Sequence, residues 1–223
     1  MLLLGIDTCG PSGSVALGRL AGSSSVEILA LTPLEGRTYS ATLVSAIGEL
    51  LSAKSLRLPD LGCLVVVSGP GSFTGVRVGL SAAKGLAEGA GIPLVSISRL
   101  KVLAATSGVP SAALDAHRHE VFLRLADQKD NSRAREWLAG AEDLAPINPP
   151  SVIAVCDEPA ADLLHHAWPA AEQLRVAAPA ASDALAAAAS AVAARDFADV
   201  AILDGHYLRR SDAEIFGNTV VRS

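Results

Sequence analysis

The chain has 223 residues, enough for one large domain or two small lobes. Half of them are hydrophobic but only 4% are aromatic, so the core has to be built from alanine, valine and leucine. A formal net charge of −5 excludes unaided binding to nucleic acid, which requires a basic surface that replaces counterions. No apolar run reaches the ~20 residues that cross a bilayer.

The first segment of the chain has the pattern of an antiparallel sheet. Leu2–Asp7 is expected to form a buried strand that ends in a carboxylate, and a turn follows over Thr8–Gly13. Ser14–Arg19 returns as a second strand and Val26–Leu31 pairs as a third. Asp7 at the strand end either holds a phosphate or a metal ion, or accepts hydrogen bonds from the amides of its own turn.

A helical period begins at Thr38 and continues to Ala53, with Thr38 or Ser40 as the cap. Its apolar side chains fall on one face. They are Leu43, Val44, Ile47, Leu50 and Leu51.

The stretch Leu64–Ala87 is the most informative part of the sequence. Leu64–Val67 is a short β-branched run typical of a strand buried on both faces. Five turn-forming residues, Ser68–Ser72, interrupt it, and a helix begins after them with Ser72 or Thr74 as its cap.

This second helix has one face that is almost free of side chains. Gly75, Gly79 and Ala83 recur at steps of four, so another element can approach the helix backbone closely. A larger apolar face lies beside it and consists of Val76, Leu80 and Leu86. Two glycines inside a helix cost roughly 1 kcal/mol each relative to alanine, which close packing or a partner has to offset.

The glycine-containing turn has two interpretations. Gly69, Gly71 and Gly75 are spaced as GxGxxxG, which differs from the dinucleotide-binding GxGxxG, and no Lys-Ser/Thr pair follows as in a P-loop. The turn either serves close packing or cradles an anion or another ligand. In the second case the binding residues would be Gly69, Gly71, Ser72 and Thr74.

The second half of the chain repeats this order after a strand at Leu94–Ile97 and a helix that Ser98 caps. The order strand, acid, turn and strand occurs again, which indicates duplication of one α/β unit. A polar stretch, Asp127–Arg135, is expected to be a surface loop. The other expected elements are strands Ser111–Asp115, Glu120–Arg124 and Val152–Cys156, and helices Ala160–Ala167 and Ala180–Arg195.

No catalytic or metal-binding motif appears in the sequence. The histidines form no HExxH pattern, and no GxSxG elbow is present. The three cysteines are widely separated and form no CxxC pair, as expected of reduced thiols in the cytoplasm. We therefore expect no catalytic residue and no metal ligand in this chain.

Two stretches resemble the TsaB (YeaZ) proteins of bacteria. They are Leu4–Thr8 with Ser14–Leu17, and the twelve residues Ser68–Gly79. Weaker matches occur at Asp115-Ala116 with Glu120–Phe122 and at Tyr207–Arg209. The similarity is strong over residues 1–100 and loose afterwards.

The resemblance implies an α/β fold with two ribonuclease-H-like lobes, as in the superfamily of acetate and sugar kinases, Hsc70 and actin. Each lobe would have a mixed sheet that opens with three antiparallel strands. Residues 1–108 would form the N-terminal lobe with the partner-binding helices. Residues 109–223 would form the C-terminal lobe, whose last helix packs back on the N-terminal one.

The resemblance also implies a function. Family members take part in making threonylcarbamoyladenosine beside the anticodon of tRNAs that read codons beginning with A. The paralogue TsaD holds the metal and transfers the threonylcarbamoyl group, TsaB is its non-catalytic scaffold or activating partner, and the ATPase TsaE binds the pair. Without TsaD the chain is expected to form a homodimer. It is expected to be cytoplasmic, to meet tRNA only through the complex, and to bind no membrane. No cofactor is expected on the isolated chain, while ATP or ADP at a subunit junction is left open.

The resemblance assigns the interface to the helices Tyr39–Ala53 and Thr74–Ala87, which pack against the equivalent helices of TsaD. The interface residues expected from it are Leu43, Ile47, Leu50, Phe73, Gly75, Val76, Gly79, Leu80 and Ala83. Asp7 and Asp115 fall where kinases of the superfamily place phosphate-site acids, but the loops around them lack the glycine pattern of those kinases. A degenerate nucleotide site is therefore expected.

Two other functions stay open from the sequence. One is an ATP-dependent small-molecule kinase of the same fold, which would use Asp7 and Asp115 around a metal–nucleotide. The other is a peptidase, a label that the paralogous family has carried, and the lack of a histidine pair counts against it.

Overall fold

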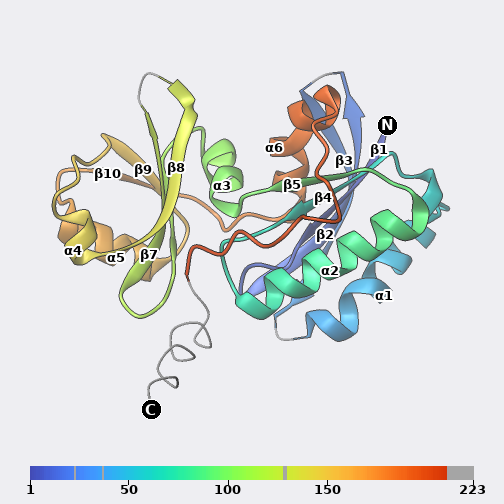
Figure 1. Ribbon diagram of the computed structural model, residues 1–223, viewed down its shortest axis with the longest axis horizontal. Coiled ribbons are helices and arrows are strands. Elements are labelled where there is room, and N and C mark those ends of the chain that lie inside the picture. The colour runs from blue at the N-terminus through green and yellow to red at the C-terminus, as the bar shows by residue number, and fades with distance from the viewer. Residues whose placement is uncertain (23, 37, 128–129, 210–223) are drawn as a thin grey trace, which may run out of the picture.

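The computed structural model describes residues 1–209 apart from residues 23, 37 and 128–129. It contains two five-stranded mixed sheets, one in each lobe (Figure 1). The strand order is β3-β2-β1-β4-β5 in the first sheet and β8-β7-β6-β9-β10 in the second. This is the two-lobed ribonuclease-H-like fold that the resemblance implies, with the same order of strands in both lobes.

The first sheet contains the predicted antiparallel opening of three strands. β1 (Leu2–Asp7) pairs with β2 (Ser12–Ala21), which pairs with β3 (Ser25–Glu35). β4 (Cys63–Val67) and β5 (Leu94–Ile97) extend the sheet in parallel with β1. β4 is buried along its whole length because helices cover both faces of the sheet.

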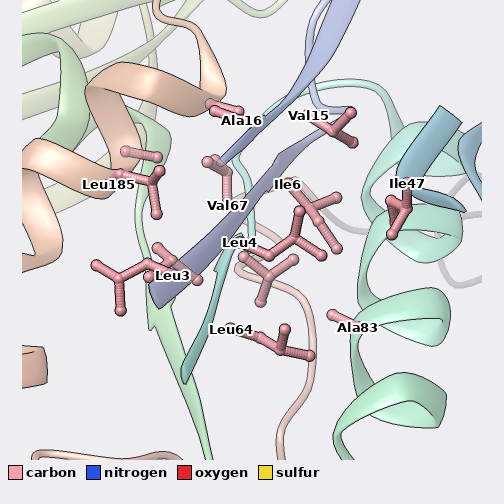
Figure 2. Packing of buried hydrophobic residues seen from close by; sticks show 14 of the residues in the cluster. Leu3, Leu4, Ile6, Val15, Ala16, Ile47, Leu64, Val67, Ala83 and Leu185 are labelled. Carbon is pink, nitrogen blue, oxygen red and sulfur yellow. The ribbon is translucent and has the colours of Figure 1, made fainter. Parts of the chain in front are cut away.

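Three helices cover the first sheet. α1 (Tyr39–Ser52) and α2 (Phe73–Ala90) lie on one face, and α6 (Ala181–Ala194) lies on the other. Figure 2 shows the consequence for the core, since Leu3 lies toward Leu185 of α6, whereas Leu4 and Ile6 lie toward α2. A 3-10 turn, Leu58–Asp60, connects α1 to β4.

The second sheet repeats the plan of the first. β6 (Ala112–Asp115), β7 (Glu120–Asp127) and β8 (Asp130–Gly140) are antiparallel. β9 (Val152–Val155) is parallel to β6, and β10 (Glu172–Arg175) is parallel to β9. The matching order and directions are those that the predicted duplication requires.

Three further helices complete the fold. α3 (Arg99–Ser107) contacts strands of the second sheet and also α6, so it lies between the lobes. α4 (Ala141–Leu144) and α5 (Glu158–Ala167) belong to the second lobe, where Asp157 caps α5 through a 2.9 Å hydrogen bond from the Ala160 amide.

The structure corrects the expectation of a surface loop at Asp127–Arg135. The backbone there forms the hairpin of β7 and β8, in which Leu125 lies opposite Arg135. β8 is an edge strand, and edge strands carry the polar residues that the sequence pattern assigned to a loop. The edge strand β10 was also not anticipated.

The end of the chain crosses between the lobes. Although α6 comes from the second half of the sequence, its apolar residues belong to the core of the first lobe. Residues 196–209, which we call the strap, then run past β5 and α2 to β7 of the second lobe, in red in Figure 1. The boundary between residues 108 and 109 stays a prediction.

Candidate functional site

A cleft of about 860 Å³ opens between the two lobes. The turn after β1 and the first turn of α2 line it from the N-terminal lobe, and the turn after β6 lines it from the other side. The strap adds His206–Arg209 to its wall. The duplicated fold therefore brings its two strand–acid–turn units to opposite sides of one cavity.

Asp7 and Asp115 have the same role in their two turns. Asp7 Oδ1 accepts a hydrogen bond of 2.8 Å from the Cys9 amide, and Asp115 Oδ1 accepts one of 2.7 Å from the His117 amide. Each acid thus holds the turn that follows its own strand. Of the two alternatives for Asp7, this is the one in which the carboxylate accepts hydrogen bonds from turn amides.

The second oxygens of these carboxylates face basic side chains. Asp7 is fully buried, and its Oδ2 lies 3.8 Å from Nε of Arg99, while Asp115 Oδ2 lies 2.9 Å from Nδ1 of His117. A divalent cation at Asp7 would meet the positive charge of Arg99, so the residues present do not fit the metal–nucleotide site of a kinase. Over the described residues, no group of three or more His, Cys, Asp or Glu could hold a metal ion.

The glycine-containing turn packs against the turn after β1. A side chain at Gly71 would overlap the carbonyl oxygen of Cys9, and the Ser72 amide donates a 2.8 Å hydrogen bond to that same oxygen. Ser72 Oγ accepts from the Gly75 amide and is the cap of α2, as predicted. Close packing thus explains Gly71, and ligand binding by Gly69, Gly71, Ser72 and Thr74 stays a prediction.

The structure shows how the expected interface residues pack within the chain, and their role in an interface stays a prediction. Eight of them are buried in the chain's own core, so their side chains face away from a partner that docks on α1 and α2 from outside. They are Leu43, Ile47, Leu50, Gly75, Val76, Gly79, Leu80 and Ala83. The reason is that the glycine face of α2 packs against Thr8 at the end of β1. A side chain at Gly75 or Gly79 would overlap Thr8.

The outward faces of α1 and α2 also carry small residues. Val44 is 63% exposed, and a Cβ at Gly48 or Gly85 would meet nothing within 4 Å. The two helices pack side by side on the outer side of the first lobe (Figure 1). The other small exposed residues of these two helices include Ala41, Ser45, Ser52, Ser81 and Gly89.

Glu136 of β8 is the centre of a polar network that joins the lobes to the strap. It accepts hydrogen bonds of 2.6 Å from Ser98 Oγ and 2.8 Å from Arg124, and it contacts His206 Nε2 at 2.8 Å. Burial alone would raise the pKa of Glu136, but the hydrogen bonds from these three side chains outweigh it and hold the pKa below its usual value.

The strap is fixed to α2 by aromatic and backbone contacts. Tyr207 packs on Phe73 with ring centroids 4.7 Å apart, and the guanidinium of Arg77 covers the Phe73 ring at 4.0 Å. Lys84 Nζ donates to the Leu203 carbonyl oxygen at 2.9 Å. Arg209 then pairs with Glu120 of β7. Phe73, Arg77, Glu120 and Tyr207–Arg209 lie in stretches that the resemblance singled out, but their contacts with one another join distant segments and no local spacing predicted them.

Comparisons with known proteins match parts of the chain to proteins of tRNA threonylcarbamoyladenosine synthesis. Residues 33–131 match the family model of TsaD, tRNA N6-adenosine threonylcarbamoyltransferase. The tRNA threonylcarbamoyladenosine biosynthesis protein TsaB of Haemophilus influenzae is 35% identical over 131 residues, which are 59% of this chain and 51% of that protein. TsaB of Bacillus subtilis is 35% identical over 134 residues, 58% of this chain and 57% of that protein.

The chain thus spans about half the length of these curated relatives. A crystal structure from Pseudomonas aeruginosa, described as similar to the peptidase YeaZ, aligns with a TM-score of 0.74 over 93% of this chain and 99% of that one. At 22% identity, this likeness shows the fold alone. Within the described part of the chain, none of the helices has the length and hydrophobicity to span a membrane.

Proposed function

We propose that the chain, which is 33–35% identical to TsaB proteins over about half of their length, is the non-catalytic subunit that binds and activates TsaD in the synthesis of threonylcarbamoyladenosine on tRNA. In this proposal TsaD transfers the threonylcarbamoyl group, and the ATPase TsaE binds the pair. The chain acts in the cytoplasm and meets tRNA only within the complex.

The observation that carries the proposal is the outward surface of α1 and α2. Glu49 is the one charged residue in the sequence of α1, whereas a helix that faces water normally carries several charges. The bare positions Gly48, Gly85 and Gly89 allow the helices of a partner to approach the backbone. We infer that TsaD covers this surface with its own pair of helices, and that two copies of this chain meet there when TsaD is absent.

The cleft supports a non-catalytic role. Asp7 is buried with its carboxylate directed to the Cys9 amide and to Arg99, which leaves it no access to a nucleotide-bound metal ion. The alternative of a kinase that uses both Asp7 and Asp115 therefore lacks one of its two acids, because only Asp115 borders the cleft. A nucleotide such as ATP or ADP, if the complex uses one beside this chain, belongs at the subunit junction.

The proposal is tested by co-purification of the chain with the TsaD paralogue of the same organism. Gly85→Leu places a large side chain on the outward face and is expected to abolish the association, because no residue of the chain itself occupies that space. Gly79→Leu, which the sequence pattern suggests for the same purpose, would instead disrupt the contact of α2 with Thr8.

The matched control is Ala186→Leu, which adds the same side chain to an exposed position of α6 on the opposite face of the sheet. Full association of Ala186→Leu with loss in Gly85→Leu supports the surface. Retained association of a folded Gly85→Leu variant would show that TsaD binds elsewhere. Sedimentation of the isolated chain checks the homodimer, and a monomer at high concentration would contradict it.

A further inference from the structure

Arg99 is a buried cation in the wall of the cleft. It is the first residue of α3, its side chain is 7% exposed, and it packs over Gly10 of the turn after β1. Burial of a guanidinium is costly unless hydrogen bonds and an opposite charge compensate it. The partners of Arg99 therefore show how far its charge and its hydrogen-bond donors are compensated within the chain.

Those partners are incomplete. The guanidinium lies 3.8 Å from the Asp7 carboxylate through Nε, which is too long for a hydrogen bond. Arg99 Nε and Asp7 Oδ2 are both enclosed, and neither has a hydrogen-bond partner among the described residues. Across this described part of the chain, the side chain of Arg99 donates no hydrogen bond at all, although a guanidinium has five N–H donors.

If Arg99 only balanced the charge of Asp7, the two side chains would be expected to lie in direct contact. Ion pairs that only compensate buried charge are usually in direct contact, as Arg124 and Glu136 are here at 2.8 Å. Asp7 instead accepts a hydrogen bond from the Cys9 amide with one of its two carboxylate oxygens. Arg99 is thus kept in place by the charge of Asp7 while its donors stay unused.

Charges of both signs line the cavity that Arg99 borders, with Asp115 and Asp157 on its wall as well as Arg118 and Arg209. The first turn of α2 borders the same cavity, and the amides at a helix N-terminus attract anions. The cavity of about 860 Å³ has room for an organic molecule that carries such a group.

We propose that the cleft binds a small molecule through a carboxylate or phosphate group held by Arg99, without a divalent cation. The planar fork of a guanidinium matches both oxyanions with two parallel hydrogen bonds. Arg99 supplies the positive charge that a metal ion supplies in a metal–nucleotide site. The inference does not depend on the proposed role in tRNA modification, since the isolated chain contains every residue it uses.

The test is calorimetric titration of the full chain with inorganic phosphate and, separately, with acetate, at constant ionic strength and with EDTA present. At least one of the two anions is expected to bind with a dissociation constant on the order of 1 mM or tighter. The anion that binds distinguishes a phosphate ligand from a carboxylate ligand. Binding of neither, or binding that requires added magnesium, would overturn the proposal.

Three variants tie the binding to Arg99. Asp7→Asn removes the competing negative charge and should tighten binding about threefold or more. Arg99→Gln in the Asp7→Asn background should weaken anion binding about tenfold or more. The double variant is used because Arg99→Gln alone would leave the buried Asp7 carboxylate without a cation. Arg175→Gln, which removes an exposed arginine outside the cleft, is the control and should change nothing.

Asp7→Asn has the more selective outcome because it predicts a gain. If no anion bound beside Arg99, removal of the Asp7 charge would leave anion binding unchanged. Equal affinities of the wild type and Asp7→Asn, or binding that survives Arg99→Gln, would therefore contradict the assignment.

Discussion

The Thr8 hydroxyl donates a 2.7 Å hydrogen bond to the carbonyl oxygen of Gly75, so the first turn of α2 is fixed to the end of β1. The same two residues touch a second time, because a Cβ at Gly75 would overlap the Thr8 carbonyl oxygen. This double contact determines which face of α2 is turned inward.

The contact predicts opposite effects for two alanine substitutions in α2. Gly75→Ala should destabilise the chain by about 1–3 kcal/mol, because the new methyl group meets backbone that cannot rotate away. Gly85→Ala should stabilise it by about 0.5–1 kcal/mol, because the space is open and alanine favours the helix. Urea unfolding followed by circular dichroism measures both, and effects of the same sign would contradict the packing.

Leu185 is predicted to be a main attachment of α6 to the first sheet. Its side chain is fully buried over Gly5 and Gly18, so Leu185→Ala leaves a cavity and should cost about 2–5 kcal/mol. Leu31→Ala is the matched control, since Leu31 is 48% exposed and should lose well under half as much. Equal losses in urea unfolding would mean that α6 does not seal this face.

The Glu136 network predicts a dependence of stability on pH. Because the folded pKa of Glu136 lies below its ordinary value of 4.5, the contribution of this carboxylate is complete above that pH and is lost as the pH falls through the folded pKa. The difference in unfolding free energy between wild type and Glu136→Gln should therefore shrink as the pH falls below 4.5 through the folded pKa of Glu136. A difference that grows on acidification would have the wrong sign.

The cysteines are predicted to be unreactive in the folded chain. Burial raises the pKa of Cys63 to about 11 and that of Cys156 to about 11, and it raises the pKa of Cys9 as well. All three should stay protonated at pH 8 and react slowly with a disulfide reagent, with Cys156, the least buried, reacting first. Chemical denaturation should release all three at once, and fast labelling of Cys9 in the folded chain would contradict its burial.

The sequence allowed much of the fold to be predicted because its strongest patterns are local. β1 and β4 are apolar runs that end in an acid or a turn, and Ser72 has the position of a helix cap. The repeat of the strand–acid–turn pattern indicated duplication of one α/β unit, and the resemblance implied the two lobes. The polar edge strand β8 was not predicted, because its composition does not differ from that of a loop.

The site was harder to predict because it depends on contacts between distant segments. Both faces of α2 carry small residues, so the pattern alone could not say that Gly79 faces Thr8 while Gly85 faces outward. Ser98, Glu136 and His206 meet only after the lobes and the strap are placed together. No spacing in the sequence connects Arg99 with Asp7.

The central claim is that this chain activates TsaD through the outward surface of α1 and α2. The most direct test is reconstitution of tRNA modification from the TsaD paralogue, TsaE, threonylcarbamoyl adenylate and tRNA. Three reactions are compared: one with the wild-type chain, one with the Gly85→Leu variant, and one with neither. Modified adenosine is expected only with the wild-type chain. Equal product without the chain, or full product with Gly85→Leu, would contradict the account.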